Sequence, residues 1–177
     1  MAARLIYDMN VSLDGYVDHD KVAPDPELFR HWIEVVREGT GSIYGRKLYE
    51  IMRYWEQDDP AWEADHRAFA EVWRNERKWV VSRTLTEVGP GVTLISDGLE
   101  AAVRRIRDEF DGEIHVGGPV LAASLTELGL IDEYRLYIHP VVLGQGAPFF
   151  TGARPPLKVT GNERIGAEAV RLTCVPA

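Results

Sequence analysis

The chain has 177 residues, of which 45% are hydrophobic and 27% charged, and its formal net charge is −8 at pH 7. This composition is typical of a single globular domain, residues 1–177, and its acidity argues against a nucleic-acid-binding surface, which needs a basic face. One cysteine, Cys174, excludes an internal disulfide bond or a paired-cysteine metal site. We expect a cytoplasmic protein that binds neither nucleic acid nor a membrane, because the sequence shows no signal peptide and no long apolar run.

The first fifty residues predict two strands, each followed by a helix. Arg4–Val11 is short and apolar, and the turn Ser12-Leu13-Asp14-Gly15 follows it. The spacing of apolar residues predicts a helix over 27–38, which Pro24-Asp25-Pro26 would begin. A brief strand over 42–44 then runs through Gly45 into a helical pattern over 48–52.

The remaining elements continue the alternation of strands and helices until the last third of the chain. We predict a surface helix over 56–77, strands over 78–82 and 92–96, and a helix over 97–110 with Asp97 and Glu100 at capping-box spacing. A strand over 113–116 precedes a helix over 120–128, and alternating apolar residues predict strands over 134–139 and 170–174. The order predicts an α/β fold, in which helices flank a mixed, mostly parallel sheet with antiparallel strands at its C-terminal edge.

The segment Val116-Gly117-Gly118-Pro119-Val120 joins a predicted strand to the start of a predicted helix. Free backbone N–H groups and the positive end of the helix dipole make such a junction suitable for an anion, typically a phosphate. Side chains at the two glycine positions would keep a pyrophosphate away from the backbone. The alternative is an ordinary strand-to-helix turn. Neither the Rossmann fingerprint nor the P-loop motif occurs, so a ligand bound here would use the phosphate site of another fold.

Two further clusters of polar residues follow predicted strands. Gly45-Arg46-Lys47 places two cations at a helix start, where the helix dipole favours acids, so an external anion would suit them. Ser82-Arg83 offers another cation and a hydroxyl group after the strand over 78–82. Each cluster alone could be an exposed basic pair. Together they would lie at the carboxyl edge of the sheet, where α/β folds bind ligands, and this convergence favours a dinucleotide.

These motifs, in this order, resemble the dihydrofolate-reductase-like fold. The resemblance covers roughly residues 3–175 and includes Ser12-Leu13-Asp14-Gly15, Gly45-Arg46-Lys47-Leu48-Tyr49-Glu50, Val80-Val81-Ser82-Arg83, Val116-Gly117-Gly118-Pro119 and Leu130-Ile131-Asp132-Glu133-Tyr134. Among its branches, the chain is most similar to the reductase domain of the bacterial deaminase/reductase of riboflavin biosynthesis. It carries no deaminase motif of its own, and would be a stand-alone paralogue.

The resemblance implies a site for NADPH. The pyrophosphate would lie by Gly117, Gly118, Pro119 and Val120, and the other phosphates by Gly45, Arg46, Lys47, Ser82 and Arg83. Contacts of these cations with the 2′-phosphate would favour NADPH over NADH. Residues 9–14 would face the nicotinamide and the substrate, with Met9, Asn10, Ser12 and Trp32 as the substrate-binding residues. Asp14 is the predicted catalytic acid, although an Asp-Gly pair after a strand is also a common turn.

The resemblance implies an NADPH-dependent reductase of a small pyrimidine- or pteridine-like heterocycle, similar to 5-amino-6-(5-phosphoribosylamino)uracil reductase. Dihydrofolate reductase itself carries an acid in its first helix, where this chain has Leu28 and Trp32. The alternatives are dihydrofolate reductase activity, a non-catalytic NADP-binding protein, and a dimeric scaffold in which residues 134–142 pair across a two-fold axis. We expect a homodimer, and no metal, because the histidines at 19, 31, 66, 115 and 139 form no His-x-x-x-His pair.

Overall fold

One large sheet organises the chain in the computed structural model, which describes residues 1–18 and 20–177. His19, one of the histidines considered as a metal ligand, lies outside the described residues. The strands of the large sheet are β1 (Arg4–Ser12), β3 (Gly41–Gly45), β4 (Lys78–Val81), β5 (Val92–Ile95), β6 (Glu113–Gly117), β7 (Glu133–His139), β9 (Leu157–Ile165) and β10 (Ala169–Pro176). Two short strands, β2 (Tyr16–Val17) and β8 (Ala147–Pro148), pair separately.

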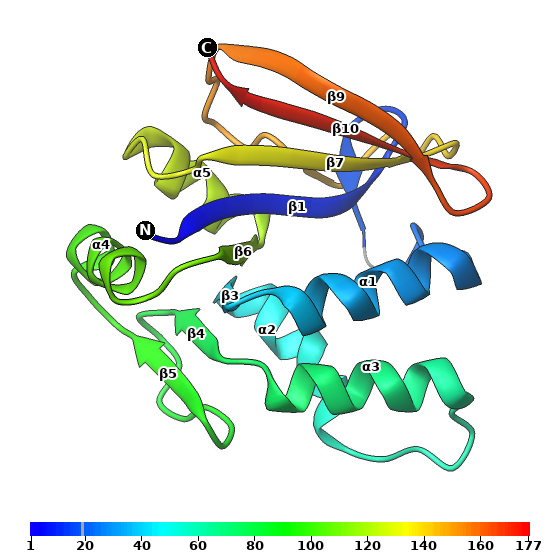
Figure 1. Ribbon diagram of the computed structural model, residues 1–177, viewed down its shortest axis with the longest axis horizontal. Helices are drawn as coiled ribbons and strands as arrows, with labels where there is room; N and C mark the ends of the chain where they lie inside the picture. The colour runs from blue at the N-terminus through cyan, green and yellow to red at the C-terminus, as the bar shows by residue number, and fades with distance from the viewer. Residues whose placement is uncertain (19) are drawn as a thin grey trace.

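The strand order in the large sheet is β5-β4-β3-β6-β1-β7-β10-β9 (Figure 1). Neighbours from β5 to β7 run parallel, and β10 pairs antiparallel with both β7 and β9. The predicted fold class, a mixed and mostly parallel sheet with antiparallel strands at its C-terminal edge, is confirmed. Since β7 lies between β1 and β10, its backbone is already paired on both sides, and the prediction that residues 134–142 pair across a two-fold axis is wrong.

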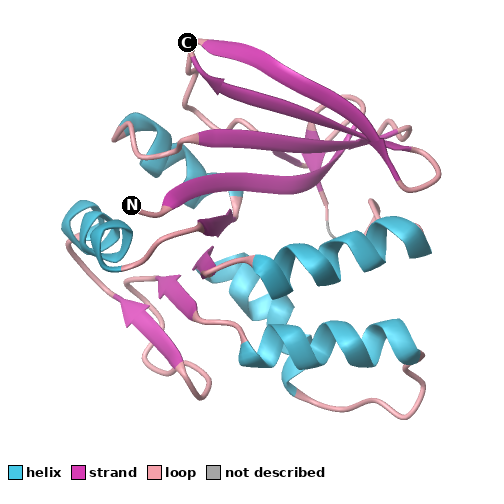
Figure 2. Cartoon of the chain, in the orientation of Figure 1, coloured by secondary structure: helices cyan, strands magenta, loops and turns pink. Residues whose placement is uncertain are grey.

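Helices cover both faces of the sheet (Figure 2). One face carries α1 (Pro26–Glu38), α2 (Arg46–Met52), the 3-10 helix η1 (Arg53–Glu56) and α3 (Ala64–Asn75). The opposite face carries α4 (Leu99–Glu109) and α5 (Pro119–Glu127). The start of α1 is fixed by Asp25, whose carboxylate accepts hydrogen bonds from the N–H groups of Glu27 and Leu28 at 2.9 and 3.0 Å. No helix in the described part of the chain has the length and apolar character needed to cross a bilayer.

Two sequence predictions fail in detail, and one strand of the large sheet was missed. The helix predicted over 56–77 begins only at Ala64, because Asp59 and Pro60 form a turn in which the Asp59 side chain accepts from Ala61 N–H at 2.8 Å. The predicted capping box of α4 is absent: Gly98 is the N-cap, in a left-handed conformation with φ of 58° and without a side-chain cap. Strand β9 was not predicted, because its side chains are mostly exposed and show no apolar alternation.

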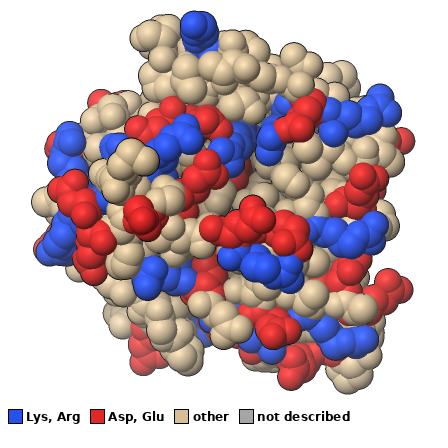
Figure 3. Space-filling view, in the orientation of Figure 1, with Lys and Arg blue, Asp and Glu red and all other residues tan. Residues whose placement is uncertain are grey.

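Acidic and basic side chains are interspersed over the face of the molecule seen in Figure 3. Arg30 of α1 pairs with Asp65 of α3 at 3.1 Å, and Arg104 pairs with Glu100 one turn away on α4 at 2.9 Å. Exposed pairs of this kind each contribute only about 0–1 kcal/mol. The functional chemistry of the chain has to be sought elsewhere, where polar groups are buried or converge.

Candidate functional site

A cleft of about 820 Å³ opens at the carboxyl ends of β1, β3, β4 and β6. Met9 and Asn10 of β1, Gly45 of β3 and Val81 of β4 line it, as does the turn between β6 and α5. Helix α1 provides one wall of the cleft through Phe29, Trp32, Val35 and Val36. Carboxyl ends of parallel strands are where open α/β sheets bind their ligands, so the fold itself directs attention to this cleft.

The structure brings the predicted cofactor residues together. All of them line this one cleft: Gly45, Arg46, Lys47, Ser82, Arg83, Gly117, Gly118, Pro119 and Val120. They come from three turns that are far apart in the sequence. Of the predicted substrate-binding residues, Met9, Asn10 and Trp32 also line the cleft, whereas Ser12 is not among its lining residues.

The turn between β6 and α5 needs both of its glycines. A Cβ atom at Gly117 would lie 2.7 Å from Leu48 Cδ2 and 2.8 Å from Tyr44 Cδ1, too close for a side chain. Gly118 has φ of 111°, which side chains rarely tolerate, and a Cβ there would lie 3.7 Å from the backbone of Gly45. The β6–α5 and β3–α2 turns therefore approach each other closely. The exposed start of α5, led by Pro119, is left free to bind an anion.

The cations of the site are solvent-exposed and only weakly paired. Arg46 forms one long ion pair with Glu50, at 3.7 Å, and both side chains are exposed. Lys47 and Arg83 are also exposed. The hydroxyl oxygen of Ser82 accepts from Thr84 N–H and Leu85 N–H at 3.2 and 3.0 Å, and so orders the turn that carries Arg83. Weak surface pairing leaves these cations available to a phosphate.

Asp14 lies outside the set of residues that line the cleft. Its carboxylate accepts hydrogen bonds from Ser12 Oγ at 2.6 Å, from Leu143 N–H at 3.1 Å and from Gly144 N–H at 2.7 Å. These bonds lower the pKa of Asp14 to about 2, so the group is ionised at neutral pH and has no proton to give. The contacts favour the alternative interpretation of Asp14 and Gly15 as a turn, here one that holds the loop after β1 to the loop before β8.

A buried polar pair at the cleft was missed by the sequence analysis. Asp8 of β1 and His115 of β6 are both buried, both line the cleft, and place Oδ2 and Nδ1 2.8 Å apart. Burial alone would lower the pKa of His115, but the Asp8 carboxylate and its hydrogen bond raise that pKa above the usual value. Asp8 lies four residues before the end of β1, and His115 lies two residues before the end of β6. A single polar residue in a mainly apolar strand was the signal from which the sequence could have indicated this pair.

A buried acid lies beyond this pair. Ser42 of β3, which is in register with His115, lines the cleft and donates a hydrogen bond to Oε1 of Glu76. Among the described residues, nothing hydrogen-bonds to the buried Oε2 of Glu76. Burial raises the pKa of Glu76 to about 7. Titratable groups thus extend from the cleft into the space between the sheet and α3.

Asn10 and Trp32 are held against each other at the α1 wall. The side-chain oxygen of Asn10 accepts from His139 Nε2 at 2.9 Å and from Trp32 Nε1 at 3.4 Å. The Trp32 ring also packs on Tyr137, with ring centroids 4.5 Å apart. The amide of Asn10 is consequently fixed, with its oxygen occupied and its NH₂ group as the remaining donor.

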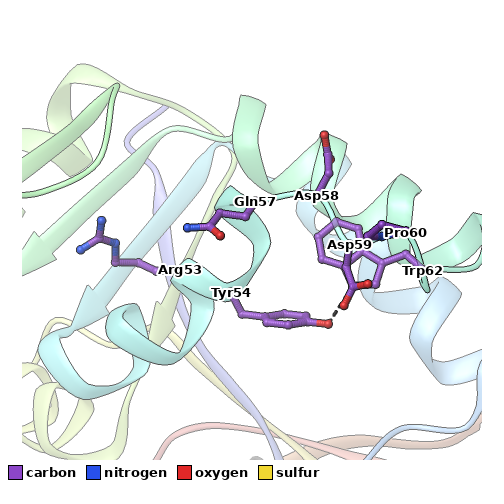
Figure 4. Close-up of a pocket in the computed structure, with 7 residues that line it drawn as sticks. All are labelled: Arg53, Tyr54, Gln57, Asp58, Asp59, Pro60 and Trp62. Atoms are coloured by element: carbon purple, nitrogen blue, oxygen red, sulfur yellow. Dashed lines mark hydrogen bonds between the residues drawn. The ribbon is translucent and has the colours of Figure 1, made fainter.

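A second hollow, of about 320 Å³, is shown in Figure 4. It is lined by Arg53, Tyr54, Gln57, Asp58, Asp59, Pro60 and Trp62 and shares no lining residue with the cleft. The indole N–H of Trp62 donates to the Tyr54 hydroxyl at 2.7 Å, the dashed line of Figure 4, and this bond orders the chain between η1 and α3. The hollow gathers none of the predicted site residues.

The sheet order, the glycine-dependent β6–α5 turn and the cleft at the carboxyl edge together define an α/β domain of the dihydrofolate-reductase-like fold class. The chain belongs to the RibD C-terminal domain family, whose model matches residues 3–171. It is 33% identical to the uncharacterized Bacillus subtilis protein YyaP over 180 residues, which cover 96% of this chain and 93% of the relative.

Two solved structures show the same fold. A riboflavin biosynthesis-like protein from Shewanella sp. PV-4 matches with a TM-score of 0.76 and 21% identity, covering 100% of this chain and 99% of the other. A diaminohydroxyphosphoribosylaminopyrimidine deaminase/5-amino-6-(5-phosphoribosylamino)uracil reductase from Thermotoga maritima matches with a TM-score of 0.68 and 15% identity, covering 99% of this chain and 57% of the longer protein. The expected resemblance to the riboflavin-type reductase domain is confirmed.

Proposed function

We propose that this chain is an NADPH-dependent reductase of a small pyrimidine- or pteridine-like heterocycle. The observation that carries the proposal is the convergence of three distant turns, after β3, β4 and β6, on one cleft. Membership of the RibD C-terminal domain family supports the same activity. When bound, the nicotinamide would supply a hydride to the substrate.

The residues of the cleft suit the parts of a dinucleotide phosphate. The absence of side chains at Gly117 and Gly118 lets the β6–α5 turn lie against Leu48, Tyr44 and the backbone of Gly45, and the N–H groups at the start of α5 would be available to a phosphate. Arg46, Lys47 and Arg83 provide positive charge for the 2′-phosphate, which distinguishes NADPH from NADH. These contacts would hold the nicotinamide end of the cofactor toward β1 and α1.

The proton that reduction of a C=N or C=O group requires is assigned, as part of this proposal, to the pair of Asp8 and His115. Both side chains line the cleft, and the raised pKa of His115 keeps a proton on the pair toward higher pH. Glu76 and Glu113 add their negative charge to this effect. Asp14 remains the sequence-based alternative, but its contacts support a role in ordering the loop.

The cofactor site is tested by titrating the protein with NADPH and with NADH while following nicotinamide fluorescence. Arg46→Ala is expected to weaken NADPH binding at least tenfold and NADH binding much less, and Gly118→Asp to weaken both. Arg104→Ala is a matched control, because Arg104 is likewise paired with a glutamate four residues away but lies on α4, outside the cleft. If neither dinucleotide binds the unaltered protein, the proposal is wrong.

The proton-supplying pair is tested with Asp8→Asn. The variant keeps the size of the side chain and removes the charge that raises the pKa of His115. We expect kcat to fall at least tenfold and the basic limb of the pH–rate profile to move to lower pH, with NADPH affinity unchanged. An unchanged profile would remove the pair from the chemistry. NADPH binding without turnover of any substrate would instead support the non-catalytic alternative, and light scattering would test the predicted homodimer.

A further inference from the structure

The cleft has two chemically different walls. Its positive charge comes from Arg46, Lys47 and Arg83, in the turns after β3 and β4. The other wall is apolar and aromatic, and its described lining residues include Val22, Ala23, Pro24, Phe29, Trp32, Val35, Val36, Met52, Trp55 and Phe69. The charged residues among the described lining of that side are carboxylates, Asp8 of β1 and Asp18 after β2.

Three aromatic rings of this wall form one cluster, and a fourth lies further along α1. Phe29 of α1, Trp55 of η1 and Phe69 of α3 pack together, with ring centroids 4.8 to 6.2 Å apart. Trp32 lies one helical turn beyond Phe29 on α1, and its indole N–H is directed to the Asn10 side chain. Flat rings gain from stacking on such surfaces, whereas a phosphate placed there would lose its hydration without gaining a cation.

Electrostatics acts in the same direction. Asp8 is buried and hydrogen-bonded to His115, which compensates one negative charge within the pair itself. Asp18 pairs with Lys21 at 3.3 Å, and neighbouring hydrogen bonds lower the pKa of Asp18, so that carboxylate stays ionised. Both carboxylates thus have a cationic partner of their own, so a phosphate bound at this wall would meet no free positive charge among the described lining residues of that side.

Resting on the proposed function, we infer that the second ligand of the cleft is an uncharged, planar heterocycle that carries no phosphate. This departs from the ribosylamino-pyrimidine phosphate to which the family resemblance points. The ring stacks on the α1 wall near Trp32, and its polar edge meets the NH₂ group of Asn10 and the pair of Asp8 and His115. Arg46, Lys47 and Arg83 of the opposite wall bind the phosphates of the cofactor.

The test uses ligand pairs that differ only by a phosphate: riboflavin and riboflavin 5′-phosphate, and uridine and uridine 5′-monophosphate. Affinities are measured calorimetrically for the protein saturated with NADP⁺, which fills the cationic wall and prevents turnover. We expect the unphosphorylated member of at least one pair to bind at least tenfold more tightly than its partner. Equal or tighter binding of the phosphorylated members overturns the inference, as does failure of all four compounds to bind at millimolar concentration.

A substitution at the wall provides an independent check. Val36→Arg places a cation on the cleft side of α1 and should reduce the preference for the unphosphorylated member at least fivefold. Val159→Arg, the same change at an exposed position of β9, should leave the preference unaltered. If NADP⁺ itself fails to bind, the proposed function fails, and the change that Val36→Arg makes to the same ratios on the protein alone still decides the nature of the α1 wall, because the cations of the other wall are common to both proteins.

Discussion

The buried carboxyl of Glu76 makes the folded state sensitive to pH in a way that one substitution can isolate. Burial raises the pKa of Glu76 from 4.5 to about 7, so the folded protein holds a proton that the unfolded chain has released. Stability is therefore lost as the pH rises from about 4.5 through about 7. Replacing Glu76 with glutamine keeps an oxygen to accept from Ser42 and abolishes the titration.

The magnitude follows from the two pKa values. One pKa unit corresponds to about 1.4 kcal/mol, so ionising Glu76 in the folded state costs about 3.4 kcal/mol when complete. About 0.8 kcal/mol of this is already lost at pH 5, which leaves about 2.5 kcal/mol to be lost between pH 5 and pH 8. The hydrogen bond from Ser42 and the charge of Lys78 lower the pKa of Glu76, and both effects are already included in this value.

The assay is urea unfolding at pH 5 and at pH 8 for the unaltered protein, Glu76→Gln and Glu71→Gln. The last is a control, since Glu71 is exposed on α3, the helix that ends at Glu76 as its C-cap. Titration of groups that do not interact with Glu76 is common to all three proteins and cancels in the comparison, whereas His115 loses in Glu76→Gln the contribution that the Glu76 charge makes to its pKa. The stability of Glu76→Gln relative to the unaltered protein should rise by about 2.5 kcal/mol from pH 5 to pH 8, or roughly 1 M in urea midpoint. Parallel pH profiles for all three proteins would refute the reasoning.

Two further predictions concern the turns. Gly117→Ala should lower Tm by several degrees, because the new Cβ would lie 2.7 Å from Leu48 Cδ2 and overpacking costs about 1–3 kcal/mol. Gly45→Ala is the control and should change Tm little, since the nearest contact of its Cβ would be at 3.5 Å. Equal shifts of Tm for the two variants in thermal denaturation would contradict this prediction. Asp14→Ala should speed amide hydrogen exchange at Leu143 and Gly144 and leave NADPH affinity unchanged. If turnover falls while exchange at these amides is unaffected, Asp14 acts in the chemistry after all.

Features that are local or periodic could be predicted from the sequence alone. The apolar stripe of α4, the Gly117-Gly118-Pro119 junction and the alternation of strands with helices each lie within a short stretch, and together they predict the sheet and its ligand-binding edge. Strand β9 escaped prediction because its pairing with β10 comes from backbone hydrogen bonds, while its side chains are mostly exposed. Exposed strands leave little hydrophobic pattern to detect.

The polar pair of Asp8 and His115 shows a different limit. The two residues are 107 positions apart, and each alone is a single polar residue in an apolar strand. Only the neighbouring positions of β1 and β6 in the sheet bring them within 2.8 Å. Asp14 shows a related limit: a motif after a strand suggested catalysis, and the partners that support a role in ordering the loop, Leu143 and Gly144, lie about 130 residues further along the chain.

The assembly of the cleft from distant turns has a consequence for how the protein folds. Because β1, β3, β4 and β6 must all be in register before the turns converge, no fragment of the chain presents the site by itself. A ligand of the cleft therefore binds only the complete sheet, and its binding energy stabilises the whole domain against unfolding rather than one loop. Slowed hydrogen exchange should spread across all four strands on binding, which makes global protection a measure of occupancy even before the substrate is known.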